Sequence, residues 1–160
     1  MSQIQIYIIL LEGLRESCFE SFTFIYKGVE KVMRILLIEP HKLPYPLEID
    51  GILDAMKKLV GGTIQAVYPF TDDLALICND EGKLLGLPLN RALYHPETDE
   101  LYDIIAGTFF LCGAPPDADH FTSLTDEQMK KYTQYFRSPE TFMRINEQII
   151  AIPEAIECKN

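Results

Sequence analysis

A chain of 160 residues with 48% hydrophobic and 24% charged residues has the size and balance of one globular domain, far from the composition of disordered chains. Its formal net charge of -10 argues against general nucleic-acid binding, which depends on clustered Lys and Arg. Such acidity keeps a protein soluble, or lets it imitate DNA and occupy a DNA-binding enzyme.

The first 32 residues differ from the rest of the chain. Their apolar run at 4–11 is too short to span a bilayer and has neither a basic n-region nor a cleavage site, so we expect no membrane association. The bases encoding 27–29 can contain a purine-rich ribosome-binding sequence, a few codons before Met33. Two interpretations stay open: translation starts at Met33 and 1–32 is upstream sequence, or 4–14 is a strand or helix packed on the domain.

Short apolar runs alternate with turn signals in the next part of the chain. The continuously apolar run at 35–38 predicts a central strand buried on both faces. Prolines make 41–48 an extended loop, with a short strand near its end. A helix is expected over 50–60, where Asp50 can cap its start and the glycine pair 61–62 ends it.

The middle of the chain predicts three further strands. Residues 64–70 and 74–78 form a hairpin pattern. The run at 87–93 has an early proline and is expected to form a helical turn. The longest apolar strand is expected over 101–112, with Gly107 inside it at a bulge or a close backbone approach.

The last part of the chain predicts a helical pair and a closing strand. Thr125 and Gln128 match a capping box that opens a helix with an aromatic stripe. A second short helix is expected over 138–145, and a strand over 148–152.

These elements predict a single α+β domain over 33–153, followed by a tail at 154–160. Its mixed, mainly antiparallel sheet of about five strands carries the helix at 50–60 and the helical pair at 125–145.

The four cysteines are scattered, without a C-x-x-C pattern or a His at ligand spacing, so they predict no zinc site. Cys78 and Cys112 lie in apolar runs and are expected to be buried thiols. A reducing cytoplasm fits this usage best.

Three motifs occur in a fixed order: GGTIQAVYPF at 61–70, LPLNRAL at 87–93 and DIIAGTFF at 103–110. Over about 33–152 the chain resembles a family of small proteins of phages and other mobile elements, catalogued only as a domain of unknown function. The resemblance implies a non-structural accessory protein in the cytoplasm of a bacterial host. By analogy it implies a role against host defences, such as sequestering a nucleotide immune signal.

Polar side chains inside these apolar runs are the candidate binding residues. The planar fork of Arg91 matches a phosphate or carboxylate, and the neighbouring Asn90 amide can read a base or ribose edge. The alternative is that Arg91 pairs with Asp103 and fastens two elements together. Tyr68 offers a stacking surface for a purine, although aromatic residues on strands are more often core.

The leading hypothesis is non-catalytic binding of a small phosphorylated nucleotide, without a cofactor, in one chain or across a homo-oligomer interface. The predicted pocket is lined by Gln65, Tyr68, Asn90, Arg91 and Thr108. Since the sequence has neither a P-loop nor a G-x-S-x-G nucleophile motif, no catalytic residue is assigned.

Two alternatives belong to other classes of function. The first is an acidic interaction protein that blocks a host enzyme. The second is a small hydrolase with a metal held by Asp117, Asp119 and His120.

Overall fold

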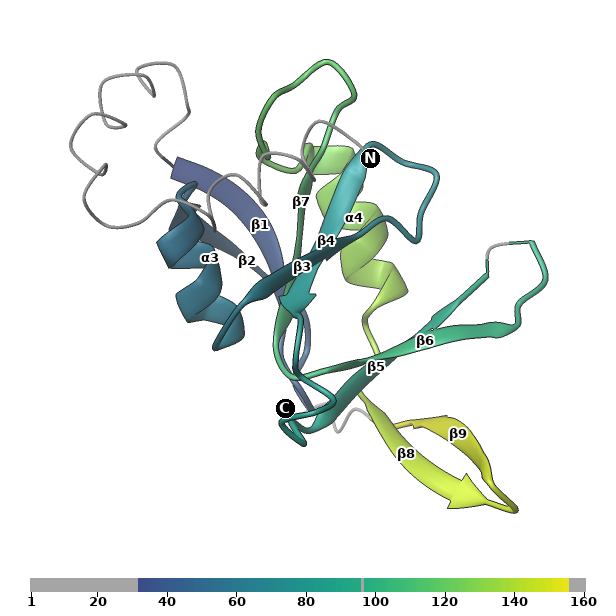
Figure 1. Cartoon of the computed structure of the whole chain (residues 1–160). Coiled ribbons are helices and arrows are strands. Elements are labelled where there is room, and N and C mark those ends of the chain that lie inside the picture. Colours follow the sequence, from purple (N-terminus) through teal and green to yellow (C-terminus); the bar gives the residue numbers. More distant parts are fainter. Residues whose placement is uncertain (1–31, 96, 156–160) are drawn as a thin grey trace, which may run out of the picture.

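The centre of the molecule is a five-stranded sheet, and the computed structural model describes residues 32–95 and 97–155. Each neighbouring pair of strands in this sheet is antiparallel (Figure 1). In spatial order the strands are β2 (Tyr45–Asp50), β1 (Val32–Ile38), β7 (Phe109–Gly113), β4 (Leu74–Asn79) and β3 (Ile64–Val67). The predicted α+β class with a mainly antiparallel sheet is confirmed.

Both faces of this sheet are buried. Helix α3 (Leu53–Val60) packs on one face and helix α4 (Asp126–Tyr135) on the other, as Figure 1 shows. Buried sheet residues on the α3 side are Met33, Ile35, Leu37, Ile64, Ala66, Ala75, Ile77, Phe110 and Cys112, and those on the α4 side are Leu36, Ile38, Leu74, Leu76, Cys78, Phe109 and Leu111. Because side chains alternate along a strand, the central strands need apolar residues at every position. The prediction for 35–38 is confirmed.

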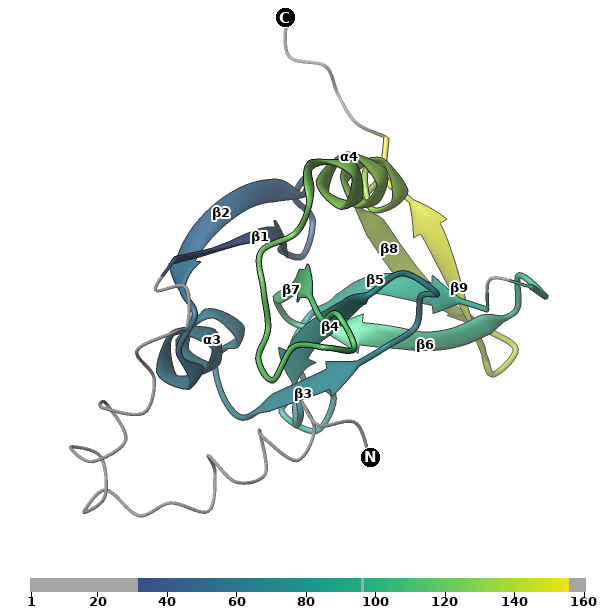
Figure 2. The ribbon, with the colours of Figure 1, turned by 90° about the horizontal axis from the view of Figure 1, so that it is seen from above.

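Two hairpins lie beyond the sheet. β5 (Leu89–Tyr94) pairs with β6 (Leu101–Ala106), and β8 (Glu140–Ile145) pairs with β9 (Gln148–Pro153). β8 lies against β5, so the second hairpin packs on the first. Figures 1 and 2 both show β9 at the outside of the molecule.

The start of α3 differs from its prediction. Asp50 is the last residue of β2, and the N-cap position is Ile52, which makes no side-chain capping bond. The end is as predicted: Gly61 adopts φ 77°, and its N–H donates to the carbonyl of Lys57. The expected loop at 41–48 becomes strand from Tyr45 on, because an edge strand tolerates proline.

The predicted helical turn at 87–93 is wrong, since this segment forms strand β5. The single strand expected over 101–112 is also wrong, because the chain divides at Gly107 into β6 and β7, which belong to different sheets. Gly107 has φ 80°, and an added Cβ would lie 2.7 Å from Cδ1 of Leu87. Only glycine fits this turn between sheets without strain.

The second helix expected over 138–145 is wrong, because this segment is strand β8. Pro139 suits the start of a helix, but the carboxylate of Glu140 accepts a bond from the backbone N–H of Ala92 at 2.6 Å and holds the segment against β5. The closing strand predicted over 148–152 is confirmed as β9, and the predicted helix opening at Thr125 is confirmed as α4.

The alternatives for residues 1–32 lie outside the described residues, apart from the last residue, which begins β1. Within the described residues, neither helix is long and apolar enough to cross a membrane. Cys78 and Cys112 are buried free thiols, as predicted, and burial raises the pKa of Cys78 to about 11. At neutral pH this thiol is therefore a protonated core side chain.

Candidate functional site

Asn90 and Arg91 are both buried on β5, although neighbouring residues of a strand normally face opposite ways. The register between β5 and β6 shifts between Leu89 and Arg91, which marks a bulge or irregularity. A bulge inserts one extra residue and can redirect a side chain. Asn90 and Arg91 are 0% and 1% exposed.

The Arg91 guanidinium donates to oxygen atoms of three segments. Its Nη2 lies 2.8 Å from the Lys42 carbonyl, and Nε and Nη2 lie 3.4 and 3.3 Å from the carbonyl of Phe136, the C-cap of α4. Its Nη1 donates to the carbonyl and side-chain oxygens of Asn90 at 3.1 and 2.9 Å. Arg91 therefore joins β5 to the end of α4 and to the loop after β1.

The Asn90 amide extends these contacts to the main sheet. Its Nδ2 donates to the carbonyls of Ile38 and Gly107, at 3.0 and 2.7 Å. Every buried side-chain N and O atom in the described part of the chain has a hydrogen-bond partner. Because unpaired buried polar groups cost about 1–3 kcal/mol each, these contacts are essential to the packing.

The alternative in which Arg91 pairs with Asp103 is not formed, because the guanidinium donates to Lys42, Asn90 and Phe136. Asp103 pairs with Lys83 instead. Burial lowers the pKa of the Arg91 guanidinium, while the nearby carboxylates of Glu140 and Glu154 oppose this shift. An arginine keeps its proton even when buried, so the cluster holds a positive charge. The N–H donors of this guanidinium bind oxygen atoms of its own chain.

The five predicted ligand residues occupy different environments. Gln65 is exposed on β3, an edge of the main sheet, and Tyr68 is exposed just after this strand. Thr108 is half-buried between β6 and β7, while Asn90 and Arg91 form the buried cluster. The structure brings Asn90 and Arg91 into direct contact, and ligand binding by the five stays a prediction.

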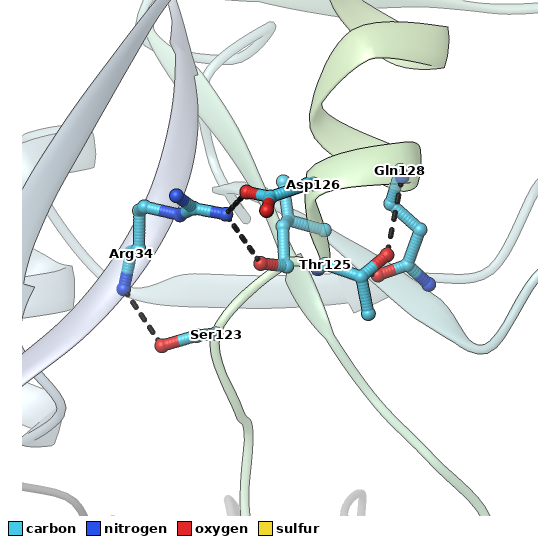
Figure 3. Close-up of polar contacts among 6 residues, drawn as sticks. Arg34, Ser123, Thr125, Asp126 and Gln128 are labelled. Carbon is cyan, nitrogen blue, oxygen red and sulfur yellow. Dashed lines mark hydrogen bonds and ion pairs between the residues drawn. The ribbon is translucent and has the colours of Figure 1, made fainter.

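The start of α4 is held by two sets of contacts. Thr125 and Gln128 form the capping box, each side chain accepting a bond from the other residue's backbone N–H. Arg34 on β1 pairs with Asp126, and its backbone N–H donates to the Ser123 hydroxyl at 3.0 Å, as Figure 3 shows. This end of the helix is therefore fixed to the central sheet.

An open hollow of about 450 Å³ lies between the start of α4 and the turn that joins β3 to β4. We call it the acidic hollow; its lining residues are Thr71, Asp72, Asp73, Thr125, Glu127, Gln128 and Lys131. The sequence predicted the turn and the helix start separately, but not that they lie side by side and line one hollow. The high density of acidic residues near Glu127 was the available signal.

The acidic residues of the hollow differ in their hydrogen bonds and exposure. Asp72 accepts bonds from the Lys131 ammonium at 2.7 Å and from the Tyr132 hydroxyl at 3.0 Å. The bond from Lys131 is the main reason that the pKa of Asp72 lies below its usual value. Asp73 and Glu127 line the same hollow and are exposed. The hollow therefore presents two carboxylates to solvent beside one ion pair.

The alternative metal site of Asp117, Asp119 and His120 is not formed. Within the described residues, no group of three or more His, Cys, Asp or Glu side chains is placed to hold a metal ion. The hydrolase alternative therefore loses the residues proposed for it.

A family model described as a domain of unknown function (DUF3846) matches residues 33–137. The matched segment begins in β1 and ends just after α4, so it contains the main sheet, both helices and the first hairpin. No curated protein and no solved structure matches the chain.

Proposed function

This chain belongs to the DUF3846 family, and from this premise we propose that it is a non-catalytic interaction protein that binds a basic surface of another protein. The acidic hollow carries this proposal. Two exposed acidic residues, Asp73 and Glu127, come from two elements and line one open space of about 450 Å³. A lysine or arginine side chain of a partner is the group that such a space accepts best.

The charge of the whole molecule supports the same partner. A net charge of -10 attracts basic surfaces over a distance of about one Debye length and speeds their encounter. At the acidic hollow, the backbone is fixed by the capping box of Thr125 and by the pair of Arg34 with Asp126. Little backbone conformational entropy is therefore lost on binding.

The resemblance to proteins of phages and other mobile elements favours an enzyme of the bacterial host as the partner. Enzymes that handle nucleic acids carry basic surfaces, and an acidic protein can occupy them. Binding would then block access of the enzyme's own polyanionic substrate.

Sequestration of a phosphorylated nucleotide is less well supported. A phosphate at Arg91 would have to displace the carbonyls of Lys42 and Phe136, which already accept bonds from the guanidinium. A phosphate at the acidic hollow would meet the carboxylates of Asp73 and Glu127. Both places oppose an anion.

The test is a calorimetric titration of the protein with an oligo-arginine peptide and with a panel of cyclic and linear nucleotides. The double variant Asp73→Asn/Glu127→Gln should weaken peptide binding about tenfold or more, because two partner-facing charges are lost. The matched control is Glu48→Gln/Asp50→Asn, which removes two exposed carboxylates from β2.

Equal weakening by both double variants would show diffuse attraction to net charge and overturn the hollow as the site. Tight nucleotide binding, seen as a raised melting temperature, would overturn the proposal in favour of sequestration. Added salt should weaken peptide binding by the wild type more than by the hollow variant.

A further inference from the structure

The C-terminal hairpin is a separate unit of the molecule. We call residues 139–154 the hairpin arm; it contains β8 and β9, which pair with each other in a sheet of two strands. At its base, the backbone N–H of Glu154 donates to the carbonyl of Pro139 at 2.7 Å. The arm begins just after residue 137, where the segment matched by the family ends. It is therefore an addition to the matched segment, closed by its own hydrogen bonds.

The hairpin arm is buried far less than the central strands of the main sheet. Every residue of β4 and β7 is buried, whereas β8 and β9, both described in full, contain exposed and half-buried residues only. The half-buried residues are Glu140 and Phe142 on β8 and Ala151 on β9. Segments with few buried contacts open at a lower free energy than the core does. We therefore expect the arm to open before β4 and β7 unfold.

Two hydrogen bonds join the arm to the rest of the described chain, and each of them ends on a carboxylate of the arm. Glu140 accepts a bond from the backbone N–H of Ala92 on β5 at 2.6 Å. Nδ1 of His41, in the loop after β1, lies 2.6 Å from Oε1 of Glu154. The Thr141 hydroxyl donates to the same oxygen of Glu154 at 2.7 Å and helps to position it. Bonds to ionised carboxylates are stronger than bonds between neutral groups, so two of them can fasten a weakly buried segment.

The arm lies close to the buried guanidinium of Arg91. β8 packs against β5, the strand that carries Arg91 (Figure 1). The carboxylates of Glu140 and Glu154 raise the pKa of Arg91, against the lowering that burial causes. Arg91 is the one charged residue that is buried in the described part of the chain. The arm therefore covers this cation and supplies two negative charges near it.

We propose that the hairpin arm is a lid that opens as one unit and uncovers Arg91, with Glu140 and Glu154 as the carboxylates that fasten it. The main sheet stays folded in the open state. Opening gives Ala92 and His41 water in place of their carboxylate partners and takes both negative charges away from Arg91. The lid thereby switches a positive charge between a buried and an exposed state. This proposal does not depend on the acidic hollow.

The hinge of the lid is the short link formed by Arg137 and Ser138. Before it, Phe136 is fixed by the bond from Arg91 to its carbonyl. The Phe136 ring also packs edge-on against the ring of Phe109 in β7, with centroids 5.4 Å apart. A rotation after Phe136 therefore moves the arm and leaves α4 in place.

Native-state amide exchange of the full chain at low urea concentrations tests the opening. An isolated hairpin is marginally stable, so the amides of β8 and β9 lose protection when the arm lifts. We expect them to exchange at least about tenfold faster than those of β4 and β7, with a small dependence on urea because little surface is exposed. Ile77→Val, a change in the core of β4, should speed exchange in β4 and β7 several-fold. It should leave exchange in β8 and β9 unchanged, because the closed and open states share the same core.

Labelling of Arg91 with phenylglyoxal, followed by peptide mass spectrometry, tests what the lid covers. Glu140→Ala removes one fastening carboxylate and should raise the labelling rate of Arg91 at least about fivefold. The control is Arg144→Ala, which removes an exposed charged side chain from the same strand and should leave this rate unchanged. The exposed Arg137 serves as the internal reference.

Two results would overturn the proposal. If Ile77→Val speeds exchange in β8 and β9 as much as in β4, the arm opens only when the whole domain unfolds. If Glu140→Ala leaves the labelling of Arg91 at the wild-type rate, the arm does not cover the guanidinium. The exchange measurement changes no residue of the arm, so it decides the proposal even where Glu140→Ala folds poorly.

Discussion

The Asn90–Arg91 cluster and the acidic hollow are both polar, but their side chains face different surroundings. Arg91 is buried and donates to carbonyls of its own chain, whereas Asp73 and Glu127 are exposed to solvent. The comparison shows that polar residues inside an apolar strand can be fully used by internal contacts, while capacity for binding lies at a turn and a helix start. Substitutions should therefore affect stability at the cluster and binding at the hollow.

The largest effect is expected from Arg91→Ala. This variant leaves the carbonyls of Lys42 and Phe136 without their buried donor and opens a cavity, so the free energy of unfolding should fall by about 3 kcal/mol or more. Urea unfolding followed by circular dichroism measures the change. Arg91→Lys should recover only part of it, because an ammonium lacks the planar fork.

The control for Arg91 is Arg137→Ala, at an exposed position just after α4. It should change the free energy of unfolding by about 0.5 kcal/mol or less. If Arg91→Ala were as mild as this control, the cluster would not be structural, and the contrast with the hollow would disappear.

An intermediate effect is expected from Thr125→Ala at the start of α4. The variant removes the hydroxyl that accepts the bond from the Gln128 backbone, which should cost about 1 kcal/mol of stability. Thr125→Ser keeps the hydroxyl and should remain close to the wild type. Thermal unfolding of the two variants checks this, and an equal loss in both would show that the cap contributes nothing.

The smallest effect is expected from Asp72→Asn and depends on pH. The bond from Lys131 lowers the pKa of the folded carboxyl below its usual value, so its stabilisation is present at neutral pH and is lost as pH falls through the folded pKa. The pair is partly exposed, so the wild type should exceed the variant by less than about 1 kcal/mol at neutral pH.

This gap should close as the pH falls through the folded pKa of Asp72, because the wild-type carboxyl is then protonated as well. Urea midpoints measured over a pH series give the comparison. Asp73→Asn, one residue along the turn, is the control and should show a smaller gap. A gap for Asp72→Asn that stayed constant into acid would contradict the assigned role of the ion pair.

Local signals predicted the elements that local physics determines. The apolar run of β1, the left-handed glycine that ends α3 and the capping box of α4 were identified from neighbouring residues. The segments at 87–93 and 138–145 were misassigned because tertiary contacts decide them: Glu140 is held by the backbone of Ala92, 48 residues away. Gly107 was singled out in the sequence, but a strand pattern does not reveal that the chain turns there, with φ 80°, from one sheet into another.

The candidate site shows the same limit. Asn90 and Arg91 stood out as polar residues in apolar surroundings, yet three of their acceptors, the carbonyls of Ile38, Lys42 and Phe136, lie 45 to 52 residues away along the chain. The acidic hollow joins a turn to a helix start across a similar separation. Sequence identified the groups that need partners, and only the fold showed which partners are internal.

The position of Phe136 has a consequence for synthesis on the ribosome. Its carbonyl, a main acceptor of the Arg91 guanidinium, belongs to almost the last residue of the segment matched by the family. A nascent chain therefore cannot complete these contacts until nearly the whole domain has left the exit tunnel. Any message cut short before that codon yields a chain in which a buried cation lacks part of its support.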